Sequence, residues 1–373
     1  MRSVMGQPQP QAAVLGTVMA GSKGSAMAFL MGRDILMPGT GRLYMDPIIS
    51  AGYFAQNNAY IVGNPAFAGE RAGSNESSAA DYVTGNGWDL FVRYKFKYLL
   101  PIGDGQDPAA SPWNLQDGLL VSGATGGESW NPLASGRTFV ELRPFYRSLQ
   151  IHSDTLDTDL KTSGLDASLF WDNRDLPANP TRGNGARFRV SRDFGALGSS
   201  GPWTVLEGEG DFYHSFGDSG RFLQQVLAVD VWAAYSPTWE AHPDGSISGN
   251  PPAYTGATLG GLFRLRGYPT QRFSDKAADY LGAEYRIIPN WNPFDRWPGL
   301  QRRMGVQWLQ FAVFAEAGRV APGWEAQALT RAMKWDAGLG VRILAKGLVA
   351  RIDVCRSPED TRVQMMVGQP FQF

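Results

Sequence analysis

The sequence has one cysteine, Cys355, and only three histidines, His152, His214 and His242, among its 373 residues. A single cysteine excludes an intrachain disulfide framework and any zinc site built on cysteines. The histidines are far apart in the sequence and match no metal-ligand spacing. The formal net charge is -1, which gives no indication of a polyanionic partner. We therefore expect no metal site, no cofactor and no nucleic-acid partner.

Long apolar runs and catalytic motifs are also missing. No run reaches the roughly 18 apolar residues that a transmembrane helix needs. The short apolar run at residues 12–21 lacks the charged flank of a signal peptide and predicts a first strand. There is no Gly-x-Ser-x-Gly motif and no phosphate-binding loop, so we expect no enzyme. A hydrolase hidden inside a barrel would need His152 or His214, and neither lies in a diagnostic local context.

Aromatic residues and glycine are abundant. The chain has 12 Trp, 13 Tyr, 20 Phe and 45 Gly. This composition is unusual for an α/β enzyme and common in extended β proteins. It favours an all-β fold.

Apolar and polar residues alternate with period two along most of the chain, as in strands with two different faces. In residues 87–100 one face carries Trp88, Leu90, Val92, Tyr94, Phe96 and Tyr98, and the other carries Asp89, Arg93, Lys95 and Lys97. A soluble β-sandwich would show the same alternation. However, the predicted strands are roughly 9 to 15 residues long and carry Trp and Tyr near their ends, which favours tilted membrane strands.

The pattern predicts about sixteen strands, an even number as in single-chain bacterial barrels. They lie near residues 12–20, 25–36, 42–54, 58–64, 87–100, 118–127, 137–151, 164–174, 185–194, 203–215, 221–236, 278–289, 307–318, 334–344, 347–356 and 361–373. We expect one antiparallel transmembrane β-barrel over residues 1–373. The long connectors 65–86, 101–117 and 240–262 are expected at the extracellular end, and the tight turns at the periplasmic end.

The last residues, 361–373, form an amphipathic segment with an aromatic end. We interpret it as the closing strand of the barrel, with Phe371 and Phe373 as a closing and assembly signal. A hydrophobic end of a soluble protein is the alternative interpretation.

Residues 260–287 carry the sequence LRGY at 265–268, and FAEAG follows at 314–318. These segments resemble the BamA/TamA/FhaC superfamily, the bacterial surface antigen family of outer-membrane barrels. In that family a long extracellular loop with a Val-Arg-Gly-Phe/Tyr tetrad folds back into a sixteen-stranded barrel. Its arginine meets an acidic residue in a Phe-x-Asp-x-Gly pattern, for which Glu316 stands in place of Asp. The resemblance implies a loop, at about 240–277, that is held in the lumen by Arg266, Gly267, Tyr268 and Glu316.

The residues themselves support this contact. Glu316 alternates with Phe311 and Val313, so it is expected to point into the lumen, where Arg266 can form a charge-assisted pair with it. Solvated loop arginines are the alternative interpretation.

WDNRDLPANPTRG at 171–183 resembles a strand end and periplasmic turn of the same family. The matching residues are Asp172, Arg174, Asp175, Pro180, Thr181 and Gly183. The periplasmic POTRA domains that precede such barrels are not found, which is a departure from the family pattern.

The resemblance implies a location in the outer membrane of a Gram-negative bacterium and a function in inserting or translocating proteins, or lipids, there. It also implies a lateral seam between the first and last strands. Expected partners are outer-membrane lipid and unfolded outer-membrane or secreted proteins, for a monomeric barrel. The alternatives are a passive channel, a surface barrel without insertase activity, and a membrane anchor for a domain outside this chain.

Overall fold

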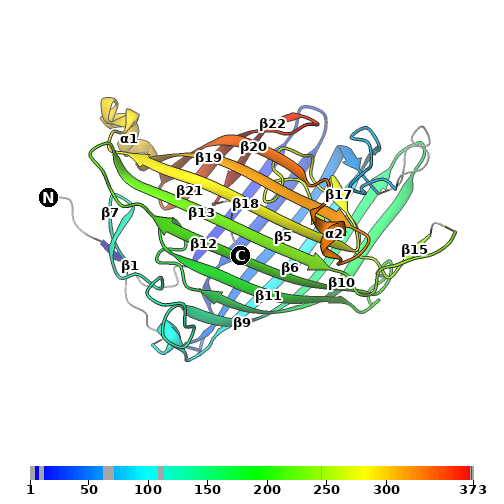
Figure 1. Cartoon of the computed structure of the whole chain (residues 1–373), viewed down its shortest axis with the longest axis horizontal. Helices are drawn as coiled ribbons and strands as arrows, with labels where there is room; N and C mark the ends of the chain where they lie inside the picture. Colours follow the sequence, from blue (N-terminus) through cyan, green and yellow to red (C-terminus); the bar gives the residue numbers. More distant parts are fainter. Residues whose placement is uncertain are drawn as a thin grey trace.

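The computed structural model describes residues 5–7, 12–61, 71–107, 113–244, 246–369 and 371. Most of them belong to one antiparallel sheet that curves around a lumen as a barrel (Figure 1). Along the sheet the strands are β2 (Ala13–Ala20), β3 (Ala26–Arg33), β5 (Leu43–Ala59), β6 (Val83–Leu99), β9 (Arg137–His152), β10 (Asp157–Asp172), β11 (Gly183–Asp193), β12 (Trp203–Ser215), β13 (Phe222–Tyr235), β18 (Ala277–Pro289), β19 (Val306–Ala321), β20 (Lys334–Ala345), β21 (Leu348–Arg356) and β22 (Thr361–Val367). The short β4 (Ile35–Leu36) pairs with β5 as a fifteenth strand.

The predicted transmembrane β-barrel is confirmed, but two of the sixteen expected segments are not separate strands of its wall. Residues 42–54 and 58–64 were expected as two strands, whereas β5 continues to Ala59 through a register shift between Phe54 and Asn57. Such a bulge keeps the ladder going where the alternation breaks. The segment 118–127 contains only β8 (Leu119–Ser122), which pairs with β7 (Trp113–Gln116) in a small sheet with β1 (Met5–Gln7).

The barrel has a loop end, where the connection from β13 to β18 lies, and a terminal end, from which the chain enters β2 and leaves β22. The loop-end connection contains β14 (Glu240–Ala241), β15 (Ile247–Ser248), β16 (Thr258–Leu259) and β17 (Phe273–Ser274), and α2 (Ala326–Thr330) follows β19 at the same end. The terminal end carries η1 (Gly103–Gly105), η2 (Pro293–Arg296) and α1 (Pro298–Met304). Figure 1 shows α1, β1 and β7 at one end of the barrel and α2, β15 and β17 at the other. Among the described residues no helix is long and apolar enough to cross a membrane.

The expectation that every long connector lies at one end is wrong. Residues 101–117 belong to the connection between β6 and β9 at the terminal end, because one strand separates them from the loop-end connection between β5 and β6. Composition predicts a loop but does not say at which end of the barrel it lies.

The two faces of the wall are those that the alternation predicted. In β20, for example, Leu339 points outward and is 66% exposed, whereas Asp336 and Arg342 point inward and are buried. In β6 the apolar side chains also point outward, and Trp88 and Leu90 are exposed. Charged side chains therefore face one another across the lumen, and apolar side chains face lipid.

Aromatic side chains gather near both ends of the outer surface, as in the interfacial girdles of membrane barrels. At the loop end these are Trp88, Trp324 and Trp335, and at the terminal end Trp130, Trp291 and Trp297; all are exposed. Several contact aromatic residues of the wall: Trp88 lies 5.7 Å from Tyr53 and Trp130 lies 5.8 Å from Phe212, measured between ring centroids.

The predicted closing strand is shorter than expected. β22 ends at Val367, and Gly368 takes a φ of 119°, which bends the chain away from the strand. Phe371 does not continue the strand; its side chain is buried against Tyr213, Val226 and Ala228 on the lumen side. Phe373 lies outside the described residues.

Candidate functional site

The loop between β13 and β18 enters the lumen and is anchored there by apolar side chains. Leu265, Tyr268 and Phe273 are each at most 1% exposed. They pack in one cluster with wall residues that include Trp203, Trp232 and Tyr280. Burial of each large apolar side chain stabilises the docked loop by about 1.5–3 kcal/mol, so this cluster alone favours docking.

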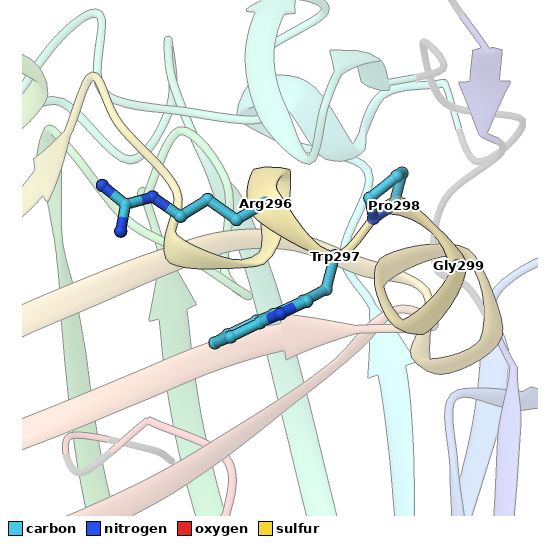
Figure 2. Close-up of a pocket in the computed structure, with 4 residues that line it drawn as sticks. All are labelled: Arg296, Trp297, Pro298 and Gly299. Carbon is cyan, nitrogen blue, oxygen red and sulfur yellow. The ribbon is translucent and has the colours of Figure 1, made fainter.

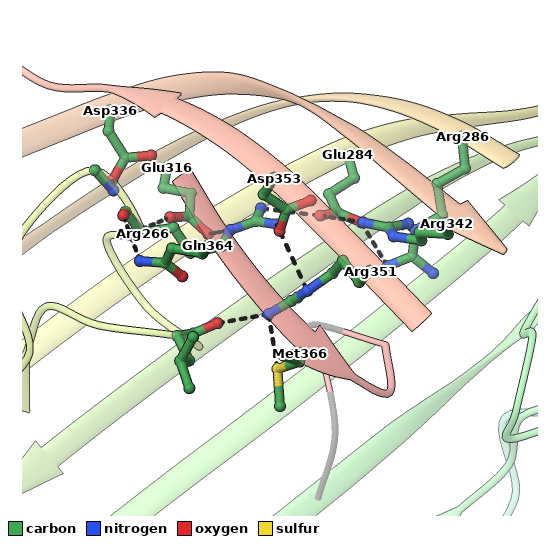
Figure 3. Close-up of polar contacts among 12 residues, drawn as sticks. Arg266, Glu284, Arg286, Glu316, Asp336, Arg342, Arg351, Asp353, Gln364 and Met366 are labelled. Carbon is green, nitrogen blue, oxygen red and sulfur yellow. Dashed lines mark hydrogen bonds and ion pairs between the residues drawn. The ribbon is translucent and has the colours of Figure 1, made fainter. Parts of the chain in front are cut away.

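Arg266 is the centre of the polar contacts between loop and wall (Figure 3). Its Nε donates to Oε1 of Glu316 at 2.9 Å, and its Nη1 donates to Oδ2 of Asp353 at 2.8 Å. Its Nη2 forms an ion pair with Glu284 at 2.9 Å. The side chains of all four residues are fully buried. The guanidinium group therefore joins β18, β19 and β21.

This cluster of acids and arginines is nearly neutral as a whole. Glu284 also pairs with Arg286 and Arg342, and Asp353 pairs with Arg351. Burial alone would lower the pKa of Arg266, but the carboxylates of Glu316, Glu284 and Asp353 outweigh it and raise that pKa. Buried charges are tolerated only when they are paired in this way. The network fixes the position of the loop rather than adding large net stability.

Two backbone N–H groups of the loop bind a pair of neighbouring acidic side chains. Glu316 and Asp336 lie directly opposite each other on β19 and β20. The N–H of Arg266 donates to Glu316 at 2.7 Å, and the N–H of Gly267 donates to Asp336 at 2.9 Å. The docked loop therefore gives a backbone donor to each of two acidic side chains that face each other in the wall.

The rest of the tetrad is also bound. Residue 267 packs closely against the wall, because a Cβ there would lie 2.7 Å from the Cβ of Asp336 and one of the two would have to shift. The hydroxyl of Tyr268 donates to the carbonyl of Trp335 at 3.2 Å. Burial raises the pKa of Tyr268 to about 12, so this hydroxyl remains a donor. Ser357 donates to the carbonyl of Gly267 at 2.9 Å.

The two arginines that flank the tetrad extend the contact to another strand of the wall and to two other connections at the loop end. Arg264 forms an ion pair with Glu209 of β12 and lies 4.3 Å from the ring centroid of Trp232. Arg272 pairs with Glu359 at 2.9 Å and donates to Ser77. Each of the three loop arginines therefore forms an ion pair with an acidic side chain.

Comparison with known proteins identifies the family. Residues 87–371 match the model of the Omp85 superfamily domain. The chain belongs to the Omp85 superfamily. Among solved structures, the crystal structure of BamA from Haemophilus ducreyi lacking POTRA domains 1–3 is similar, with 10% identity and a TM-score of 0.48 over 96% of this chain and 70% of that chain. No match was found among curated proteins.

As an Omp85 barrel the chain is an outer-membrane protein of a family of non-enzymatic assembly and transport factors. In the part of the chain that the structure describes, no group of histidine, cysteine or acidic side chains is arranged to hold a metal ion.

The second predicted motif forms a compact turn between β10 and β11 at the terminal end. Arg174 donates to both oxygens of Asp172, at 2.7 and 2.8 Å. Asp175 accepts from the N–H groups of Leu176 and Thr181. The structure thus pairs Asp172 with Arg174, whereas Asp175 binds within the turn that contains Pro180, and Gly183 begins β11.

The sequence predicts Glu316 as the acidic partner of this Omp85 loop but gives no prediction for Glu284, Asp336 and Asp353, which also bind it. All three lie on the polar faces that the alternation of β18, β20 and β21 indicates. That alternation was the available signal, but which polar-face acid meets the loop depends on strand register, and register was not predicted.

Proposed function

We propose that this Omp85 barrel acts in the insertion or translocation of proteins, or of lipids, at the outer membrane. The observation that carries the proposal is that β2 and β22 are the two ends of the sheet, and that no ladder pairs them with each other among the described residues. β2 has 8 residues and β22 has 7, whereas β5 and β6 have 17 each. Short terminal strands can form few hydrogen bonds with each other, so the wall opens most easily between them.

The contents of the lumen support a route through the wall rather than along the barrel axis. The loop with Arg266 and the segment that carries Phe371 both occupy the lumen. A substrate strand that pairs with the free edge of β2 or β22 would satisfy that edge and leave the loop in place. We therefore propose unfolded outer-membrane or secreted proteins as substrates of a monomeric barrel.

The test uses the purified full chain in phospholipid vesicles and a urea-denatured outer-membrane barrel as substrate. Folding of the substrate is followed by its heat-modifiable gel mobility. We expect faster folding than in vesicles that carry an unrelated barrel at the same density. Equal rates would remove the insertase proposal.

The alternative of a passive channel is tested in planar bilayers with the same preparation. A barrel whose lumen is occupied by its own loop should show a low, mostly closed conductance. Large steady conductance with the loop intact would favour the passive channel.

A further inference from the structure

The connection between β18 and β19, residues 290–305, exposes an unusual amount of apolar surface at the terminal end. Trp291, Trp297 and Met304 are 56%, 59% and 41% exposed. Figure 2 shows Trp297 beside Arg296, Pro298 and Gly299, which together line a surface pocket. Exposed apolar groups of this size mark a surface that is covered in the native environment.

The same connection is basic. Arg296, Arg302 and Arg303 are exposed, and no ion pair joins any of them to a carboxylate in the described ranges of the chain. Asp295 is the acidic residue of the connection, and it accepts from Gln301 at 3.2 Å. The connection therefore has a net charge of about +2, by count of its side chains.

The connection lies beside the lipid-facing surface of the wall, which indicates that lipid covers it. The ring of Trp291 lies 6.3 Å from that of Phe311, a residue of the outer face of β19. The exposed apolar residues therefore continue the lipid-facing surface of the barrel at the level of its aromatic girdle. Tryptophan beside arginine at the level of the aromatic girdle is typical of an element that lies in the headgroup layer of the membrane.

We propose that residues 290–305 form an interfacial site that binds anionic phospholipid headgroups in the leaflet at the terminal end of the barrel. Trp291, Trp297 and Met304 enter the boundary between headgroups and acyl chains, and the three arginines select anionic over zwitterionic headgroups. The site does not depend on the proposed insertase function, because it concerns only the lipid around the barrel.

The test labels Met304→Cys with bimane in the full chain; Cys355 is fully buried and does not compete for the label. The protein is reconstituted in vesicles that contain nitroxide-headgroup phosphatidylglycerol or, at the same density, nitroxide-headgroup phosphatidylcholine. Both leaflets carry the nitroxide, so the orientation of the barrel does not matter. We expect at least about threefold stronger quenching by the anionic lipid, well within the effect of three basic side chains near a charged surface.

The matched variants separate a specific site from general charge. Replacing Arg296, Arg302 and Arg303 with Gln should reduce quenching by the anionic lipid to the level of the zwitterionic lipid. Replacing three exposed basic residues at the loop end with Gln, Lys23, Arg331 and Arg356, removes the same charge and should leave the preference intact. If the triple variant fails to fold, the single variants Arg296→Gln, Arg302→Gln and Arg303→Gln give the same test, and each should lower the preference for the anionic lipid in part. Equal quenching by both lipids would overturn the selectivity, and no quenching by either would overturn the membrane contact.

Discussion

Arg266 is the residue whose loss should affect the most contacts, because its side chain meets carboxylates from three strands. Arg266→Ala should lower the free energy of unfolding by about 3–5 kcal/mol, since it leaves buried Glu316 without a cation and removes one cation from Glu284 and Asp353. In a double-mutant cycle with Glu316→Ala, the coupling energy should be about 0.5–3 kcal/mol. The measurement is the denaturant midpoint of heat-modifiable gel mobility. Strictly additive losses would contradict the proposal that Arg266 and Glu316 hold the loop.

The matched control for this cycle is Arg221→Ala. Arg221 is exposed at the terminal end, and its replacement should change the free energy of unfolding by no more than about 0.5 kcal/mol.

Gly267 tests the fit of the loop without removing a charge. Gly267→Ala places a Cβ 2.7 Å from that of Asp336, so loop or wall must shift. Overpacking of this kind costs about 1–3 kcal/mol. The expected result is faster trypsin cleavage after Arg266 and Arg272, which are fully buried in the docked loop.

The control is Gly299→Ala, because a Cβ at Gly299 would meet open space. Unchanged trypsin resistance in Gly267→Ala would show that the loop does not depend on this close approach.

Among the elements, the segment after β22 differs most clearly from the prediction, because it does not continue the closing strand expected over residues 361–373. Phe371 packs on Tyr213, and Arg286 lies 5.3 Å from the centroid of its ring. Phe371→Ala should lower the free energy of unfolding by about 3 kcal/mol, at the lower limit for a buried phenylalanine. It should also raise the conductance in planar bilayers, because the segment no longer fills that part of the lumen.

Val367→Ala serves as the control, since Val367 is half exposed on the outer face of β22. It should leave the conductance unchanged. Equal conductance for Phe371→Ala and the control would place the segment outside the conducting path.

Alternation of apolar and polar residues was sufficient to predict most of the strands of the wall, because lipid on one side and charge on the other impose period two. It failed where a strand continues through a bulge, as β5 does at Asn57, and where a short apolar stretch pairs away from the wall, as β8 does. The inward bend at Gly368 could not be predicted either, since the alternation of β22 continues to the aromatic residues beyond it. The alternation of apolar and polar residues indicates whether a side chain faces lipid or the lumen. Tertiary contacts decide where a strand ends.

For the molecule as a whole, the membrane determines how much stability is lost when a charged residue replaces an apolar one on the outer surface. Leu339 lies in the middle of β20 and Leu348 begins β21 at the terminal end; both are exposed on the outer face. Leu339→Arg should lower the free energy of unfolding by about 2–4 kcal/mol, and Leu348→Arg by only about 0–1 kcal/mol, because the cost of a charge falls with distance from the bilayer midplane. Reversible unfolding from phospholipid vesicles measures both. Equal costs would mean that the outer surface does not meet a membrane at the expected depth.

The acids that bind the loop have a consequence for the order of assembly. Glu284, Glu316, Asp336 and Asp353 lie on four consecutive strands, β18 to β21. A slip of one residue in any of these strands would turn its acid from the lumen toward lipid. Arg266 and its neighbour Gly267 can therefore dock only after the four strands have paired in the correct register. Docking of the loop is thus a late folding step that distinguishes a correctly assembled wall from a misregistered one, and a misregistered barrel would keep its loop accessible to periplasmic or surface proteases.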